Sequence, residues 1–191
     1  MSHTPAPYMR SQELLSRDAS RLLIVDVQEK LVPKIHAAQR MIANCAKLID
    51  GAAILAVPVM ATEQYPRGLG PTVSELSSRL SAPIEKVRFS CVEALAWGSA
   101  AEQPDRRGQI VVAGIEAHVC VLQTVLDLLS NGYEVFVPAD AVSSRSESDW
   151  KFALDRMAGC GATIVTTEAV LFEWCEAAGT PQFKQISQLV K

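Results

Sequence analysis

The sequence predicts an α/β fold, a doubly wound (Rossmann-like) sheet of about six mainly parallel strands with helices on both faces. Short, continuous apolar runs such as RLLIVDV (21–27) and IVVA (110–113) are typical of parallel strands covered on both faces. Segments with apolar residues at helical spacing alternate with these runs, as in strand–helix–strand units. The chain has 191 residues, 49% of them hydrophobic, which is enough to bury one sizeable core.

The first half of the chain divides into an arm and the beginning of the sheet. Residues 1–18 are predicted to form a polar N-terminal arm, and residues 19–191 a single domain. The prolines and glycines of residues 62–71 predict a loop at the carboxyl end of the second strand. We expect strands at 21–27, 58–61 and 84–87, and helices at 39–56 and 72–80.

The second half repeats the alternation. Asn131 and Gly132 end the helix that begins near residue 118, because both tolerate the left-handed conformation. The loop at 140–146 offers good N-cap residues for the next helix, and a C-terminal tail follows the last one. We expect strands at 110–113, 133–137 and 162–165, and helices at 92–101, 118–130, 146–158 and 168–178.

Composition excludes several classes of protein. The net charge is −3 and no basic run is present, which argues against a nucleic-acid surface. The first 18 residues lack a hydrophobic signal core, and no apolar run approaches the roughly 18 residues of a membrane span. Five cysteines are widely spaced without a CxxC, which indicates reduced thiols in a cytoplasmic protein rather than a disulfide framework or a zinc site.

Cys120 is placed in the first turn of a helix that directly follows a central strand. Unpaired N–H groups and the helix dipole favour a thiolate there. In open parallel sheets, the crevice beyond the carboxyl ends of the strands is where ligands bind. A buried structural cysteine is the alternative, because free cysteine is among the most buried residue types. Position alone leaves both interpretations open.

Asp26 and Lys86 are predicted at the carboxyl ends of two other strands. A carboxylate can remove the proton of a cysteine nucleophile, and an ammonium group stabilises the charged forms. Each residue also has an ordinary explanation, since Asp26 could cap a loop and Lys86 could lie on a solvated edge. The spacing alone therefore makes Asp26, Lys86 and Cys120 one hypothesis among several.

Several motifs resemble a known family. IVDVQEKL, KVRFSC and VVAGIEAHVCVLQT, in this order, resemble the isochorismatase-like cysteine hydrolase superfamily. TEQYPRGLGPTV, DAVSSRS and PQFKQISQLVK resemble the isochorismatase domain-containing subgroup in particular. The resemblance runs from about Arg21 to the C-terminus.

The resemblance implies a catalytic triad of Asp26, Lys86 and Cys120. It also implies a cis peptide after Ile115 and an oxyanion hole made by the backbone N–H groups of Glu116 and Cys120. The expected activity is hydrolysis of a small amide or related carbonyl compound through a thioester, without a cofactor, in a homo-oligomer (dimer or tetramer). The alternative is a binding or assembly module that kept the fold without turnover.

This sequence differs from other members of the superfamily in two ways that bear on the expected metal and substrate. Nicotinamidase-like relatives hold a metal through an aspartate and histidines after the second strand, whereas ATEQYPRGLGPTV has no histidine. The three histidines are dispersed, so we expect no catalytic metal. Isochorismatases proper lack the cysteine, which argues against isochorismate as substrate.

The loops at the carboxyl ends of the strands are expected to hold the small-molecule substrate. The residues predicted to line the mouth of this substrate site are Gln28, Glu63, Gln64, Tyr65 and Arg67, and residues 143–145 are predicted to close it. Glu63 and Arg67 could equally form a surface pair. Cys91 is expected to pack in the core, and His118, two residues from Cys120 on a helical turn, is not expected to form a dyad with it.

Overall fold

The computed structural model describes residues 8–191; residues 1–7, which begin the predicted N-terminal arm, lie outside the described residues. One seven-stranded sheet forms its centre, in the order β3-β2-β1-β4-β5-β7, and β6 pairs with the end of β4. All of these pairs are parallel, which confirms the predicted α/β fold. The strands are β1 Ser20–Val25, β2 Val59–Gln64, β3 Ile84–Lys86, β4 Gln109–Ile115, β5 Glu134–Pro138, β6 Val142–Ser143 and β7 Thr163–Val165.

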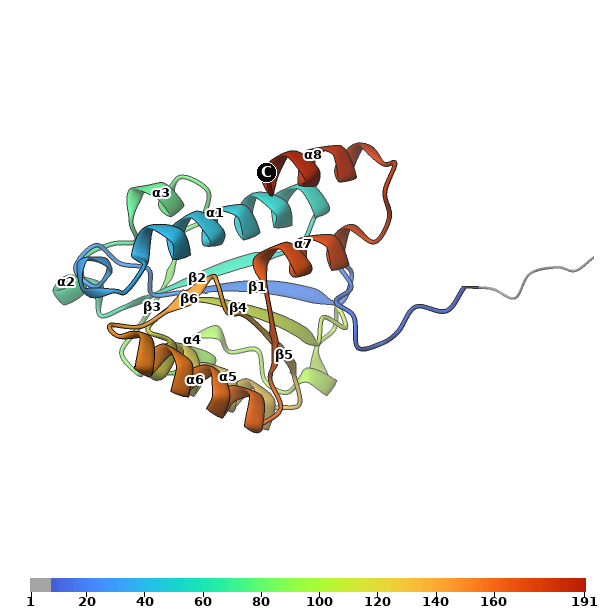
Figure 1. The fold of residues 1–191 in the computed structure, drawn as a ribbon. Coiled ribbons are helices and arrows are strands. Elements are labelled where there is room, and N and C mark those ends of the chain that lie inside the picture. Colours follow the sequence, from blue (N-terminus) through green and yellow to red (C-terminus); the bar gives the residue numbers. More distant parts are fainter. Residues whose placement is uncertain (1–7) are drawn as a thin grey trace, which may run out of the picture.

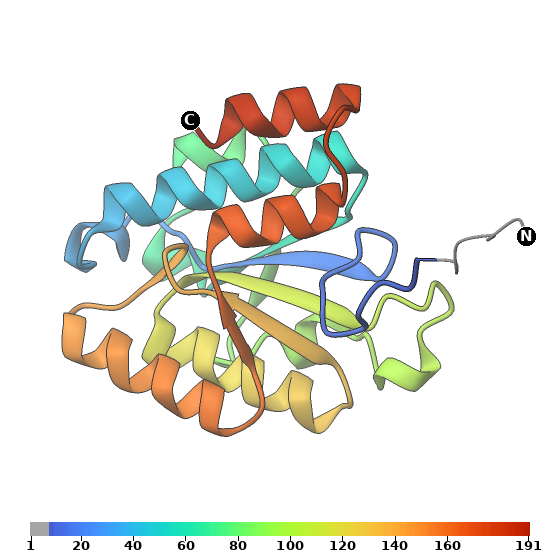
Figure 2. The same cartoon turned by 45° about the vertical axis from the view of Figure 1, so that its right-hand side comes forward.

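Helices cover both faces of the sheet (Figure 1). One face carries α1 Ala38–Leu55, α3 Ser74–Ser77, α7 Thr167–Cys175 and α8 Pro181–Leu189. The other carries α4 Val92–Leu95, α5 Leu122–Ser130 and α6 Glu147–Gly159. Figure 2 shows the two layers as the cyan and red helices above the sheet and the yellow and orange helices below it. Within residues 8–191, no helix has the length and apolar character needed to cross a membrane.

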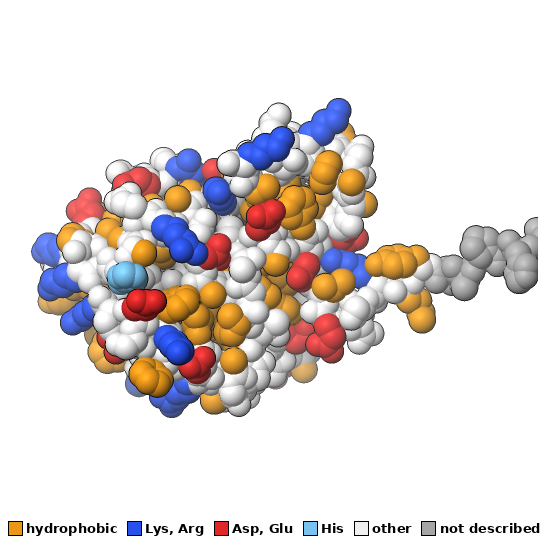
Figure 3. Space-filling model, in the orientation of Figure 1, with side chains coloured by type: hydrophobic (Ala, Val, Ile, Leu, Met, Phe, Trp, Pro, Cys, Tyr) orange, Lys and Arg blue, Asp and Glu red, His pale blue; other side chains and the backbone are white. Residues whose placement is uncertain are grey.

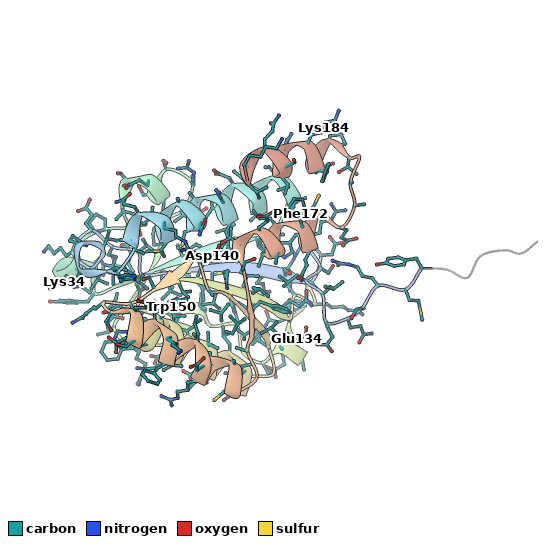
Figure 4. All side chains as sticks on the ribbon, viewed as in Figure 1. Lys34, Glu134, Asp140, Trp150, Phe172 and Lys184 are labelled. Atoms are coloured by element: carbon teal, nitrogen blue, oxygen red, sulfur yellow. The ribbon has the colours of Figure 1, made fainter. Side chains whose placement is uncertain are left out.

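Short elements complete the connections. The turns η1 Val32–Lys34 and η2 Ala100–Glu102 are 3₁₀ helices, α2 Pro66–Leu69 is a single helical turn, and η3 Ala117–Val121 is a π-helical turn that leads into α5. Glu134 begins β5 and Asp140 lies just beyond its end, so together they mark the direction of that strand in Figure 4.

Alternate residues of the central strands face two separate cores. Leu22 and Ile24 of β1 pack on the side of α1 and α7. Leu23 and Val25 pack on the opposite side, against α5 and α6. Every residue of β1 and β4 is buried, as their continuous apolar runs predicted.

Two predicted loop and helix boundaries are wrong. β2 does not end at residue 61 but continues to Gln64, because Thr62, Glu63 and Gln64 pair with β3. The helix expected over 92–101 is divided into α4 and η2, with Gly98 at a positive φ between them.

The predicted C-terminal tail is also wrong, because it contains α8. The Thr180 side chain accepts a hydrogen bond from the Phe183 N–H, and Pro181 occupies the first turn, which is a good helix start. Ile186 is fully buried against α1 and α7. Thr180 and Pro181 were thus readable signals for this helix.

The described part of the predicted arm packs on the domain. Leu15 is fully buried, and its N–H donates to Glu173 of α7 at 2.8 Å. The Arg10 guanidinium donates to the carbonyls of Leu15 and Glu173 at 2.8 and 2.6 Å. Residues 10–15 are therefore tied to α7.

Gly114 lets β4 approach β1 closely, and its replacement is the first prediction. Its φ is +114°, and a Cβ there would lie 2.2 Å from the Val25 carbonyl oxygen. We expect Gly114→Ala to lower the free energy of unfolding in urea by about 3 kcal/mol. The matched control is Gly108→Ala, whose Cβ would meet nothing within 4 Å, with an expected change within about 0.5 kcal/mol. Equal losses in the two variants would contradict this account.

Candidate active site

Asp26 lies directly beyond β1, fully buried, with a φ of +51°. Aspartate is one of the few residues that adopts this left-handed conformation readily. Its Oδ1 accepts a hydrogen bond from the Thr62 hydroxyl at 2.8 Å, and its Oδ2 accepts one from Lys86 Nζ at 2.7 Å. Both carboxylate oxygens are therefore occupied by protein donors.

Lys86 is the last residue of β3, and its side chain crosses the end of β2 to reach Asp26. The side chain is only 2% exposed. Its ammonium also donates to Gln64 Oε1 at 2.7 Å and to the carbonyls of Phe89 and Arg88 at 2.9 and 3.2 Å. An ammonium has three N–H donors, so these acceptors satisfy it without water.

Cys120 lies in η3, after β4, on the other side of β1 from Lys86. Its residue exposure is 6%. The Cys120 thiol is among the groups that lower the pKa of Asp26, and Asp26 and Lys86 both act on the pKa of Cys120, so the three side chains are near neighbours. The structure therefore brings Asp26, Lys86 and Cys120 together, as the resemblance implied.

The electrostatics of the site keep the thiol protonated. Burial, and next the negative charge of Asp26, raise the pKa of Cys120, and the nearby Lys86 only partly offsets them. Burial also raises the pKa of Asp26, against the lowering effect of Lys86 and Thr62. The expectation of a thiolate stabilised by the helix start is not met, because desolvation outweighs it. Burial of the site therefore favours the neutral Cys120 thiol over the thiolate.

Four further side chains border the site: Thr62 and Thr124, which the sequence analysis did not single out, Gln64, which was predicted to line the substrate mouth, and Cys91, which packs in the core as predicted. Cys91 Sγ lies 3.4 Å from the Thr62 hydroxyl, and its N–H donates to Thr124 Oγ1 at 3.0 Å. Thr124 in turn donates to the Cys120 carbonyl at 2.7 Å. Thr62 and Gln64 share one face of β2, so extending that strand to residue 64 would have revealed both by alternation.

The residues predicted to line the substrate mouth lie at the carboxyl end of the sheet, and they differ in burial and in their hydrogen-bond partners. Gln28 is fully buried and bonds backbone groups of Gln64 and Gly70. Glu63 Oε1 accepts from the Thr72 N–H and hydroxyl at 2.6 and 2.7 Å. Tyr65 is mostly exposed. Contact with a substrate by any of them stays a prediction.

The turn that carries Cys120 is tied to the loop after β5. The Ile115–Glu116 peptide is cis. The Glu116 carboxylate accepts two hydrogen bonds from the Arg145 guanidinium, at 2.8 and 3.0 Å. His118 Nδ1 lies 3.0 Å from the Ser144 hydroxyl. The loop predicted to close the mouth is therefore held against η3.

Among residues 8–191, no group of three or more histidine, cysteine, aspartate or glutamate side chains is placed to hold a metal ion. The described site is built from one carboxylate, one ammonium, thiols, hydroxyls and amides. The absence of a metal stays a prediction.

Comparison with known protein families gives one match over most of the chain. Residues 20–169 match the model of the isochorismatase domain. Isochorismatase domain-containing protein 2 of Danio rerio is 42% identical over 176 residues, covering 92% of this chain and 89% of that protein. The Homo sapiens protein of the same name is also 42% identical over 176 residues, covering 91% of this chain and 83% of that protein.

Solved structures show the same fold. The structure of a protein named MAR1 ribonuclease, from Caenorhabditis elegans, has a TM-score of 0.83 and 38% identity, covering 93% of this chain and 92% of that chain. The YcaC protein of Escherichia coli, described as an octameric hydrolase of unknown specificity, has a TM-score of 0.82 and 24% identity, covering 95% and 92% of the two chains.

The buried ion pair gives a prediction for stability. Lys86→Met leaves the Asp26 carboxylate buried without its partner, and we expect a loss of about 3–5 kcal/mol in unfolding free energy near neutral pH. Adding Asp26→Asn should recover part of the loss. Arg79→Met, which breaks a pair at 3.0 Å with both side chains more than a third exposed, should cost less than about 1 kcal/mol.

The sign of the pH effect follows from the raised pKa of Asp26. Without Lys86 the folded state holds the Asp26 proton more tightly than the unfolded state does. The loss of unfolding free energy caused by Lys86→Met should therefore grow as pH rises from about 5 to about 8. Urea unfolding across this range measures it, and a loss no larger than that of Arg79→Met would contradict the prediction.

The burial of the cysteines gives a prediction for their reactivity. Burial raises the pKa of Cys45 to about 12 and that of Cys91 to about 11, whereas Cys160 is exposed. Because the thiolate is the reacting form, iodoacetamide at about pH 8 should modify Cys45 and Cys91 at least about a hundredfold more slowly than Cys160. Peptide mass mapping measures each rate, and the rates should converge in urea. Fast labelling of Cys91 in the folded protein would contradict its buried position.

Proposed function

The chain belongs to the isochorismatase-like hydrolase family, and we propose that it is a cysteine-dependent hydrolase of a small amide or related carbonyl compound. The observation that carries this proposal is the buried Asp26–Lys86 pair, with 2.7 Å between Nζ and Oδ2, beside the Cys120 thiol whose pKa both groups affect. A buried ion pair contributes little to stability compared with apolar side chains of the same size. Its presence beside a thiol therefore favours a chemical role.

Acylation begins with proton transfer from the Cys120 thiol to Asp26. Burial raises the pKa of Asp26, which makes it a stronger base than a solvated carboxylate, while Lys86 keeps it ionised. The sulfur then attacks the carbonyl carbon of the substrate, and the carbonyl oxygen becomes an oxyanion. We assign the backbone N–H groups of Glu116 and Cys120 to hold it, where one such donor typically contributes about 3 kcal/mol.

Collapse of this intermediate breaks the C–N bond. The amine leaves with the proton carried by Asp26, and the acyl group stays on Cys120 as a thioester. Asp26 then takes a proton from a water molecule, whose oxygen attacks the thioester carbon. The acid product leaves, and the proton returns from Asp26 to the thiolate, so the resting thiol is restored.

RNA cleavage is a second candidate, because the similar C. elegans protein is named a ribonuclease. The net charge of −3 does not favour an RNA surface. On the face shown in Figure 3, lysine and arginine side chains are interspersed with acidic ones rather than gathered into a patch. The non-catalytic assembly module is the remaining alternative. The homo-oligomer, a dimer or tetramer, stays a prediction that light scattering can test.

The test compares variants on defined probes. We expect Cys120→Ala to abolish hydrolysis of p-nitrophenyl acetate and of any primary amide that the native protein cleaves, by at least about a thousandfold, because the nucleophile is removed. Intact-mass analysis should show an acetyl adduct on the native protein that Cys120→Ala lacks. Asp26→Asn should abolish both signals.

Cys160→Ala is the matched control, since this cysteine is exposed, and it should behave like the native protein. Single-stranded RNA, assayed in parallel by gel, separates the second candidate. Full turnover by Cys120→Ala on a probe that the native protein cleaves would overturn the thioester mechanism. RNA cleavage without amide or ester hydrolysis would favour the ribonuclease instead.

A further inference from the structure

Gln64 is the one neutral side chain among the acceptors of the Lys86 ammonium in the described residues. Its Oε1 lies 2.7 Å from Nζ, the same distance as Asp26 Oδ2. The two backbone acceptors, Phe89 and Arg88, lie farther away, at 2.9 and 3.2 Å. Gln64 therefore shares with Asp26 the closest contacts of the ammonium.

The orientation of the Gln64 amide is fixed by its other end. Nε2 donates to the Val87 carbonyl at 2.6 Å, so Oε1 must face the ammonium. A flipped amide would place an NH₂ group against Lys86 and a carbonyl against the Val87 oxygen, losing both hydrogen bonds. The amide thus presents its oxygen to Lys86 in one way only.

Gln28 fixes the backbone of Gln64. Gln28 Oε1 accepts from the Gln64 N–H at 2.7 Å, and Gln28 Nε2 donates to the Gln64 carbonyl at 3.0 Å. The second proton of Nε2 reaches the Gly70 carbonyl at 2.7 Å. Gln28 stands two residues after Asp26, so the chain that carries the carboxylate also holds the residue that carries the second acceptor.

We propose that Gln64 is a positioning residue, which holds the Lys86 ammonium on Asp26, and that Gln28 braces Gln64 in place. The lysine side chain is long and flexible, and a single carboxylate does not fix its end. Asp26 beyond β1 and Gln64 at the end of β2, at equal distances from Nζ, fix it together with the two backbone carbonyls. This inference rests on the proposed function for its catalytic meaning, and it replaces substrate contact as the role of both glutamines.

The consequence concerns the groups that face the ammonium. These are Asp26, Cys120 and Cys91, and Lys86 lowers the pKa of all three. An ammonium that moves away from Asp26 should therefore make the Cys120 thiol harder to deprotonate. Loss of the Gln64 acceptor should therefore lower the rate at which Cys120 reacts.

The test is the rate of Cys120 alkylation by iodoacetamide against pH, followed by peptide mass mapping. Gln64→Met preserves length and removes the acceptor, and we expect it to slow Cys120 about tenfold across the range. Gln64→Glu keeps an acceptor oxygen and adds a negative charge, which raises the pKa of Cys120. The alkylation of Cys120 in this variant should therefore begin at higher pH, and at that pH its rate should reach the rate of the native protein. Gln123→Met, at an exposed glutamine of α5, is the matched control and should leave the profile unchanged.

Buried Cys45 reports on general loosening of the fold. A native Cys120 profile in Gln64→Met would overturn the inference. An equal decrease of the Cys120 alkylation rate in Gln64→Met and Gln64→Glu, together with faster labelling of Cys45, would also overturn the inference, because it would assign Gln64 a purely structural role. Alkylation needs no substrate, so these outcomes are independent of the hydrolysis assay. Failure of the proposed function would show in that other assay, as substrate turnover by Cys120→Ala.

Discussion

The ion pair between Asp26 and Lys86 is the constraint on which the carboxyl end of the sheet depends. Removing two charges from water costs several kcal/mol for each ion, and their attraction offsets this only when the remaining donors and acceptors are also paired. The chain supplies those partners from β2, through Thr62 and Gln64, and from the backbone after β3. The loops beyond β1, β2 and β3 are therefore organised around one buried contact.

The exposed apolar side chains beside the site follow from the same contact. The carbonyls of Val87, Arg88 and Phe89 all point inward, the first to Gln64 and the other two to Lys86. This leaves the Val87 and Phe89 residues 79% and 52% exposed. Their exposure accompanies the use of backbone oxygens of this segment to solvate a buried ammonium.

Strand-end reasoning on the sequence put Asp26, Lys86 and Cys120 at one edge of the sheet, because parallel strands bring their carboxyl ends together, but only the family resemblance selected them as a set. Local patterns do not determine how deeply that edge is buried, and this burial raises the pKa of Cys120 although the start of a helix favours a thiolate. The role of Gln28 depends on a backbone 36 residues away, which no periodicity reveals. By contrast, β2 as far as Gln64 and the helix after Thr180 were readable, from strand alternation and from capping residues.

A neutral resting thiol changes how the site must work. A cysteine with a lowered pKa is reactive toward any electrophile, whereas here burial and Asp26 keep the proton on sulfur until the base accepts it. In the proposed mechanism, proton transfer and attack are then coupled, and backbone donors that stabilise the oxyanion make the transfer favourable. On this proposal, the rate of acylation depends on how precisely Lys86 is held against Asp26. The proposed positioning of the ammonium by Gln64 therefore has more effect in such a site than it would beside a preformed thiolate.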